Sequence, residues 1–321
     1  MKKWMIGGIG TVAIAASAAY IGVGNYFYNF ALRVNNDKQF LEGNEAFTSV
    51  TNIDPQLEAA QVALDEKFVS EHLAETISII STDDLKLQLN GTMFTQKVPS
   101  HKWVITTHGY TGQSEEMLRW ARNFYARGFN VLMPNLRGHG NSEGAYIGMG
   151  WHDRYDMLAW IDEIIRRDPN AEIVLLGISM GAATVMNTSG EEMPSNVKVV
   201  IEDSGFSSVR GVFGHQLKEL FRLPEFPVLN AANTVTKWRA GYDLFKANPV
   251  EQIAKSVTPT LFIHGDQDSF VPFYMLDEVY QAANLEKEKL VIEGAGHTMS
   301  VRVDPVRYWE TVFHFIEKYI D

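Results

Sequence analysis

The chain has 321 residues, 45% of them hydrophobic and 21% charged, and its formal net charge is −11. This composition indicates a globular protein, and the length suits one large α/β domain with an appendage. The acidic balance, with no basic face visible in the sequence, argues against a nucleic-acid partner. Because the chain has no cysteine, disulfides, cysteine nucleophiles and thiolate metal sites are excluded together.

Residues 1–33 resemble a membrane anchor or an export signal. Lys2 and Lys3 precede the apolar stretch 4–24, and no further charge follows until Arg33. The stretch is long enough to cross a hydrocarbon layer of about 30 Å as a transmembrane helix, and the lysines favour a cytoplasmic amino terminus. The aromatic residues that follow would then lie at the outer membrane interface: Tyr26, Phe27, Tyr28 and Phe30.

The alternative is a signal peptide cleaved at the small residues 16–18. The first interpretation predicts a single-pass protein of the cytoplasmic membrane with its main domain outside, and the second predicts a secreted protein. Cleavage would leave an apolar new terminus, which is awkward for a soluble product, so we favour the uncleaved anchor.

Residues 34–71 are predicted to form a polar linker followed by a helix. Asp54 can cap this helix and Pro55 suits its first turn, and the apolar residues that follow have roughly helical spacing. Two alternating segments around the turn at 82–84 then predict an antiparallel hairpin, which begins the main domain at residues 72–321.

From Lys102 onward, apolar strands alternate with amphipathic helices, which is typical of a mostly parallel sheet covered by helices on both faces. The alternation stops at about 206–250 and resumes afterwards, so we interpret this interval as a small helical lid inserted over the sheet. Its apolar residues either bind substrate or pack the lid onto the sheet: Phe213, Leu217, Leu220, Phe221, Leu223, Phe226, Val228, Leu229 and Trp238.

The stretch "IVLLGISMGAA" places one serine between two glycines where a buried strand is expected to pass into a helix. The pattern Gly177-x-Ser179-x-Gly181 predicts a nucleophile elbow, a strained turn that presents the serine hydroxyl. The pattern alone is weak, because a helix that begins with small residues would share it. The flanking strand and helix favour the elbow.

A nucleophilic serine needs a base, and the base needs an acid that orients it. Asp266 and Asp268 follow one predicted strand, and His297 follows the next, at the strand ends where such sheets build their sites. The oxyanion also needs N–H donors. The backbone N–H groups of Met180 and Tyr110 are the candidates.

The chain resembles the α/β-hydrolase superfamily, and within it the branch of serine aminopeptidases, monoglyceride lipases and membrane-anchored bacterial hydrolases. The resemblance is carried, in order, by "HGYTG", "RGFNVLMPNLRGHGNSEG", "GISMGA", "HGDQDSFVP" and "GAGH" across residues 102–321. It implies Ser179 as the nucleophile, Asp268 rather than Asp266 as the acid and His297 as the base, with Tyr110 and Met180 as oxyanion donors. It also implies that the loop at 137–140 supports the site and that His139 is not catalytic.

No cofactor or metal is expected, because neither zinc spacing nor a complete calcium loop nor a dinucleotide fingerprint is present. Asp153, Asp156 and Asp162 lie along one predicted helix and are interpreted as solvent contacts or caps.

A serine at the elbow predicts a hydrolase that forms an acyl-enzyme from an ester, thioester or amide. We favour a carboxylic ester with an acyl or aromatic group, because the predicted lid is apolar. A serine aminopeptidase that acts on short peptides stays open, with Glu219 or Glu225 as the carboxylate that holds the amine. So do an acyltransferase and a non-catalytic binding protein at the cell surface.

Overall fold

The computed structural model describes residues 2–34, 53–284 and 286–320, and for residues 2–13 only the helical backbone. Its centre is an eight-stranded sheet of order β1-β2-β4-β3-β5-β6-β7-β8. β1 and β2 pair antiparallel, as do β2 and β4, and every other pair is parallel. The strands are β1 (Glu75–Ile80), β2 (Gln88–Phe94), β3 (Lys102–Thr107), β4 (Asn130–Pro134), β5 (Glu172–Ile178), β6 (Val197–Asp203), β7 (Thr260–Gly265) and β8 (Lys287–Ile292).

Helices cover both faces of the sheet. One face packs against α3 (Pro55–Glu71), α4 (Leu118–Tyr125), α11 (Ser300–Val303) and α12 (Pro305–Ile316), and a short 3₁₀ helix, η2 (Ser114–Met117), leads into α4. The other face packs against α5 (Asp153–Arg167), α6 (Met180–Ser189), α9 (Pro249–Ile253) and α10 (Tyr274–Ala282). The central strands are buried from end to end because helices lie on both sides of them, which is why they are almost continuously apolar. The predicted fold class, a mostly parallel sheet with helices on both faces, is confirmed.

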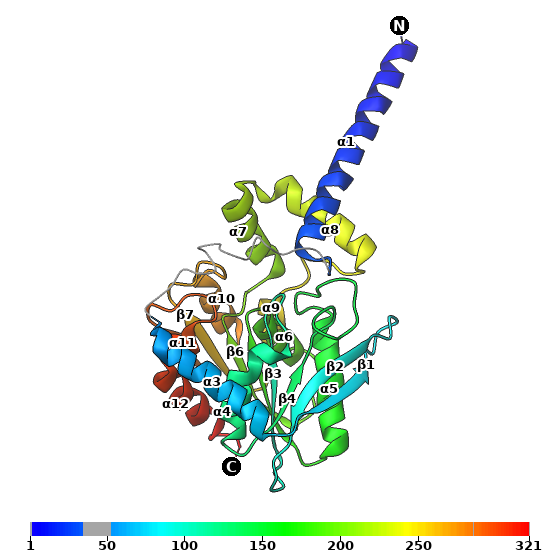
Figure 1. Ribbon diagram of the computed structural model, residues 1–321. Helices are drawn as coiled ribbons and strands as arrows, with labels where there is room; N and C mark the ends of the chain where they lie inside the picture. Colours follow the sequence, from blue (N-terminus) through cyan, green and yellow to red (C-terminus); the bar gives the residue numbers. More distant parts are fainter. Residues whose placement is uncertain (1, 35–52, 285, 321) are drawn as a thin grey trace.

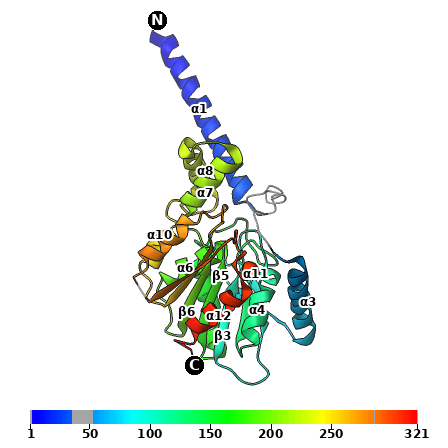
Figure 2. The same cartoon turned by 90° about the vertical axis from the view of Figure 1, so that its left-hand side faces the viewer.

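The interval at 206–250 is mainly helical. It contains α7 (Val209–Phe221) and α8 (Glu225–Arg239), followed by irregular chain into α9. Figures 1 and 2 place α7 and α8 at one end of the molecule, together with the end of α1 (Lys2–Ala31) and opposite the C-terminus. The Asp54 carboxylate caps α3 by accepting a hydrogen bond from the Gln56 N–H.

Helix α1 packs against α8 through its second half. A Cβ on Gly24 would collide with the carbonyl oxygen of Ala231, so only glycine allows the two helices to approach so closely. Arg239 of α8 donates hydrogen bonds to the side-chain oxygens of Asn25 and Asn29. The helix is therefore joined to the lid by packing and by polar contacts.

The prediction that residues 1–33 form a transmembrane helix is not supported. Among the described residues, no helix combines the length and apolar character needed to cross a membrane. The expected outer aromatic belt is also wrong in part. Tyr28 is buried in the core, Phe27 packs on the lid, and Phe30 lines a cavity, because the domain itself covers this part of α1. Most of the predicted linker, residues 35–52, lies outside the described residues.

A second correction concerns the acidic residues of α5. Asp162 is exposed as expected, but Asp153 and Asp156 are buried. The carboxylate of Asp156 pairs with Arg137 at 2.7 Å, and that of Asp153 accepts a hydrogen bond from the Gly150 N–H. Helical spacing alone does not reveal this burial, because the covering loop comes from elsewhere in the chain.

Candidate active site

Ser179 stands at the sharp turn between β5 and α6. Its backbone has φ 54° and ψ −117°, a conformation that residues other than glycine rarely adopt. A Cβ on Gly177 would collide with the Gly181 carbonyl, and a Cβ on Gly181 would collide with the Thr107 carbonyl. The two glycines therefore let β5, α6 and the end of β3 meet around the serine, as the elbow pattern predicts.

The three side chains predicted for catalysis lie together. His297 Nε2 is 2.8 Å from Ser179 Oγ, and His297 Nδ1 is 2.7 Å from Asp268 Oδ2. They come from the loops after β5, β7 and β8, which end at the same edge of the sheet. The geometry suits proton transfer from serine to histidine.

Asp268 is surrounded by hydrogen-bond donors. Its Oδ1 accepts from the N–H groups of Phe270 and Val271, and its Oδ2 lies 3.1 Å from His264 Nε2 as well as next to His297. Burial by itself would raise the pKa of Asp268, but the charge of His297 and the hydrogen bonds of both histidines outweigh burial and hold that pKa well below its usual range. The carboxylate is thus ionised and fixed at neutral pH.

The predicted oxyanion donors flank the serine. Met180 is the first residue of α6, so its N–H has no partner within the helix. Tyr110 lies in the loop after β3, and Gly109 lets this loop approach: a Cβ on Gly109 would lie 3.3 Å from Ser179 Cβ. The Tyr110 hydroxyl donates to the Ala31 carbonyl at 2.5 Å, which ties the loop to the end of α1.

Two buried histidines lie in the loops after β3 and β4. His108 Nε2 accepts from the Leu136 N–H, and its ring stands edge to face against His139. Burial lowers the pKa of His108 to about 3 and that of His139 to about 4. Neither ring lies against Ser179, so these histidines support the loops, as the resemblance implied for His139.

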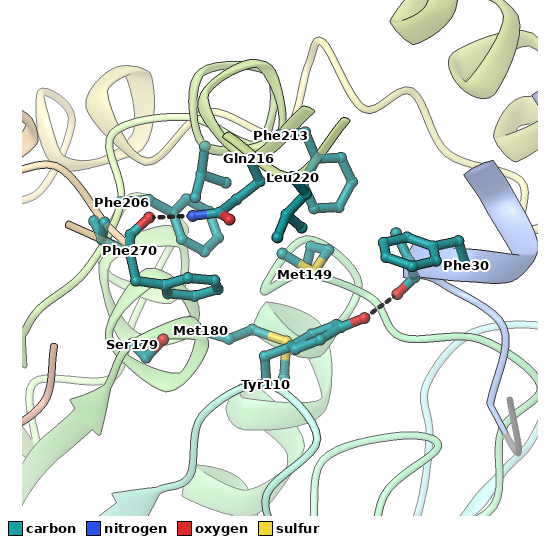
Figure 3. Close-up of a pocket in the computed structure, with 13 residues that line it drawn as sticks. Phe30, Tyr110, Met149, Ser179, Met180, Phe206, Phe213, Gln216, Leu220 and Phe270 are labelled. Carbon is teal, nitrogen blue, oxygen red and sulfur yellow. Dashed lines mark hydrogen bonds between the residues drawn. The ribbon is translucent and has the colours of Figure 1, made fainter. Parts of the chain in front are cut away.

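An apolar cavity opens on one side of Ser179, between the sheet and α7 (Figure 3). Its walls enclose about 540 Å³ of space, part of which opens to solvent. Within the described part of the chain, no aspartate or glutamate contributes to the wall. The lining residues are Phe30, Ala31, Tyr110, Met149, Ser179, Met180, Phe206, Val212, Phe213, Gln216, Leu220, Phe270 and Val271.

A second, more polar cavity also borders Ser179, and His297 and Thr298 form part of its wall. Glu116 also lines it, and burial raises the pKa of this carboxyl above its usual value. In acyl transfer a protonated histidine gives its proton to the leaving group, so an ester bound here would place its leaving group toward His297 and its acyl group in the apolar cavity (the acyl cavity).

Comparison with known proteins gives a family match over part of the chain. Residues 99–223 match the family described as serine aminopeptidase, S33. The Bacillus subtilis protein YqkD is 27% identical over 219 residues, which cover 68% of this chain and 72% of YqkD. A thermostable monoacylglycerol lipase of Bacillus sp. (strain H-257) is 23% identical over 233 residues, which cover 67% of this chain and 90% of the lipase.

Solved structures show the same fold. The Pyrococcus furiosus esterase Pf2001 superimposes with a TM-score of 0.62 at 23% identity, covering 78% of this chain and 93% of the esterase. The chain has the α/β-hydrolase fold. A Pyrococcus horikoshii acylaminoacyl peptidase gives a TM-score of 0.61 at 19% identity, covering 80% of this chain and 43% of the peptidase. Together these matches support the predicted serine hydrolase, while the roles of individual residues and the substrate stay predictions.

Several residues at this site were not among the predicted site residues. Phe30 and Ala31 line the acyl cavity, although they belong to the segment interpreted as a membrane anchor. His264 faces Asp268 although it lies in strand β7, not in the loop that follows. Phe270, two residues after Asp268, packs against the His297 ring with the two ring centroids 4.8 Å apart. Both His264 and Phe270 lie within the motif "HGDQDSFVP", so these two could have been suspected from the sequence.

The predicted lid residues divide into three groups. Phe213 and Leu220 line the acyl cavity, whereas Leu217, Val228 and Leu229 pack the lid internally. Phe226 and Trp238 are 74% and 79% exposed. Glu219 and Glu225, the candidates for binding an amine, instead pair with Arg222 and Arg210 at the surface and line neither described cavity beside Ser179.

The described residues include no group of three or more histidine, aspartate and glutamate side chains suited to hold a metal ion.

Proposed function

We propose that this protein is a serine carboxylesterase that hydrolyses esters with an apolar acyl or aromatic group. The observation that carries the proposal is the apolar cavity beside Ser179, on the side where the acyl group must lie. The named activities of the monoacylglycerol lipase and the esterase among its relatives agree with it.

In the proposed mechanism, Ser179 Oγ attacks the ester carbonyl while His297 Nε2 takes the serine proton. Asp268 keeps His297 in the correct tautomer and stabilises the imidazolium that forms. The N–H groups of Tyr110 and Met180 bind the oxyanion. His297 then protonates the departing alcohol, and a water molecule activated by the same histidine releases the acid from Ser179.

An aminopeptidase needs a carboxylate on the acyl side to hold the free amine of its substrate. Burying an unpaired ammonium group is costly, and none of the residues that line the described acyl cavity carries a negative charge. Glu116 lies on the leaving-group side, where it does not meet that amine. The charge distribution therefore favours ester hydrolysis over the removal of amino-terminal residues.

The location of the enzyme is a separate proposal, and it rests on the sequence alone. Lys2 and Lys3 followed by the apolar stretch 4–24 are the grounds for placing the protein at the cytoplasmic membrane with its hydrolase domain outside. Cell fractionation with an alkaline carbonate wash tests this. A full-length protein in the soluble fraction would contradict it, and a shortened protein in the medium would favour secretion after signal cleavage.

The function is tested with the full-length wild type and Ser179→Ala. The substrates are 4-nitrophenyl esters of increasing acyl length and aminoacyl anilides with free or blocked amines, and the measured quantity is kcat/KM. We expect the wild type to hydrolyse the esters, and Ser179→Ala to lose at least about a thousandfold in kcat/KM.

Three contrary results would each identify a different function. A preference for anilides with free amines would establish an aminopeptidase. Transfer of the acyl group to an added alcohol in preference to water would establish an acyltransferase. If a fluorophosphonate probe labels neither protein, Ser179 is not an activated nucleophile and a binding function takes precedence.

A further inference from the structure

Gln216 of α7 is the one side chain with an amide group among the described residues that line the acyl cavity. Its Nε2 donates to the Phe270 carbonyl at 2.7 Å. Because only the nitrogen of the amide can donate, this hydrogen bond assigns the positions of Nε2 and Oε1. The Oε1 atom consequently points into the cavity, as Figure 3 shows. This oxygen is buried and has no hydrogen-bond partner among the described residues.

A buried acceptor without a partner is unfavourable, and native structures usually satisfy such groups with protein, water or ligand. The neighbouring walls cannot supply a donor, because Phe213 and Leu220 present only carbon. The hydroxyl of Tyr110 already donates to the Ala31 carbonyl. The partner of Gln216 Oε1 therefore has to come from what occupies the cavity.

Gln216 also lines a second apolar cavity, of about 450 Å³, between the lid and α1. The two cavities share the walls formed by Phe30, Ala31, Phe213, Gln216 and Leu220. An acyl chain long enough to pass from Ser179 toward α1 would thus pass Gln216 part-way along its length. The amide oxygen of Gln216 would therefore lie beside the middle of the acyl chain and not beside the reacting carbonyl.

The apolar surroundings of Gln216 also restrict which chemical group can donate a hydrogen bond to its Oε1. An ammonium group would be buried here without a counter-charge, whereas a hydroxyl is neutral and both donates and accepts hydrogen bonds. We propose that Gln216 is a specificity-determining residue whose Oε1 accepts a hydrogen bond from a hydroxyl on the acyl chain. The enzyme then prefers hydroxyacyl esters to plain acyl esters of the same length. This inference rests on the proposed esterase function.

The test compares 4-nitrophenyl octanoate with a series of 4-nitrophenyl hydroxyoctanoates in which the hydroxyl moves along the chain. For the full-length wild type we expect one position to raise kcat/KM about tenfold over the plain ester, the effect of one buried hydrogen bond. Gln216→Met keeps the length of the side chain and removes the acceptor. In this variant the ratio between the two esters should fall to about one or below.

His215→Leu is the matched control. His215 contacts the Ser269 carbonyl at 2.9 Å, so it ties α7 to the same loop as Gln216 does, but it does not line the cavity. His215→Leu should retain the hydroxyl preference even if its overall rate falls. A preference lost in both variants would assign the effect to the tie between α7 and the loop, and would overturn the proposal.

Two further results would also overturn it: a wild type that hydrolyses octanoate with no preference for any hydroxyl position, or a Gln216→Met variant that keeps the preference. Both leave the esterase function standing, whereas a wild type that hydrolyses no ester removes the function itself. Calorimetric binding of methyl octanoate and methyl hydroxyoctanoates to Ser179→Ala measures the same preference without turnover, with about tenfold tighter binding expected for the preferred hydroxyl ester.

Discussion

Two aspartates in the loop after β7 differ in what they contact. Asp268 meets His297, whereas Asp266 Oδ1 accepts a hydrogen bond from the Gly294 N–H at 2.7 Å and so holds the loop that carries the histidine. We expect Asp268→Asn to lower kcat/KM for an ester by about 10³- to 10⁴-fold, because an amide favours the wrong tautomer of His297. Asp266→Asn keeps an oxygen for Gly294 and should stay within about tenfold of the wild type.

Both variants are assayed after circular dichroism has shown that they are folded. Equal losses would mean that the acid cannot be assigned to Asp268 on this geometry. A greater loss in Asp266→Asn would move the assignment to that residue.

Glu202 is a fully buried carboxyl beside the site. Burial raises its pKa from an ordinary value of 4.5 to about 8, although His264 and the Gly205 N–H oppose the shift. Below pH 4.5 both the folded and the unfolded state hold the proton, and folding carries no penalty. Between pH 4.5 and 8 only the folded state holds it, so stability falls as the pH rises.

Glu202→Gln removes this titration. The free energy of unfolding of the wild type should fall from pH 4.5 to 8 relative to that of the variant. The difference between the two proteins should change by roughly 3–5 kcal/mol across this range. Urea unfolding at a series of pH values measures the difference. Parallel curves for the two proteins would show that Glu202 does not titrate in this range.

At the scale of elements, α1 matters because it forms part of the enzyme. Phe30 and Ala31 are walls of the acyl cavity, and the Tyr110 hydroxyl binds the last turn of the helix. A protein that begins at residue 34 would lack these walls and would expose the core around Leu32. The helix is thus part of the wall of the proposed substrate cavity, whatever its relation to a membrane.

Substitutions at two glycines of α1 distinguish the docking of this helix on α8 from the stability of the helix itself. A Cβ on Gly24 meets the Ala231 carbonyl, whereas a Cβ on Gly22 has nothing within 4 Å. Gly24→Ala should push α1 away from α8 and lower kcat/KM by about ten- to a hundredfold, because the wall of the cavity shifts. Gly22→Ala should leave activity unchanged and favour the helix by about 1 kcal/mol.

Steady-state kinetics and thermal unfolding of the two variants measure these effects. If Gly24→Ala has the activity and the melting temperature of Gly22→Ala, α1 does not dock on the lid as described.

At the scale of the whole molecule, one buried guanidinium joins three distant parts of the chain. Arg137, in the loop after β4, lies 2.7 Å from Asp156 of α5 and 2.7 Å from Asp83 at the turn of the β1–β2 hairpin. Burial by itself would raise the pKa of Asp156, and it reaches about 6 even though Arg137 lowers it. The positive charge of Arg137 therefore offsets the cost of keeping the carboxylates of Asp156 and Asp83 ionised in the protein.

Arg137→Met should destabilise the fold by about 3–5 kcal/mol, because it leaves a buried carboxylate unpaired. The double variant Arg137→Met/Asp156→Leu should recover much of the loss. Urea unfolding checks both, and Arg166→Met, which removes an exposed i,i+3 pair with Glu163, serves as the control with little expected change. A single variant as stable as the control would show that the cluster contributes nothing.

The sequence by itself determined the local chemistry of this protein. The Gly177-x-Ser179-x-Gly181 turn and the alternation of strands and helices are short-range patterns, and each reflects a rule that acts within a few residues or one βα unit. Ser179, Asp268 and His297 are far apart in the sequence, but each follows a predicted strand, and parallel strands end at one edge of the sheet. The α/β fold, and the meeting of the three side chains at one edge of the sheet, could therefore be anticipated.

Only the tertiary structure decided what surrounds that chemistry. The burial of Asp156, the place of Phe30 in the cavity wall and the orientation of Gln216 all join segments that no local pattern connects. An apolar helix at the N-terminus looks the same in the sequence whether lipid or a lid covers it, because both offer an apolar surface. Which of them buries a given residue depends on the packing of the whole chain.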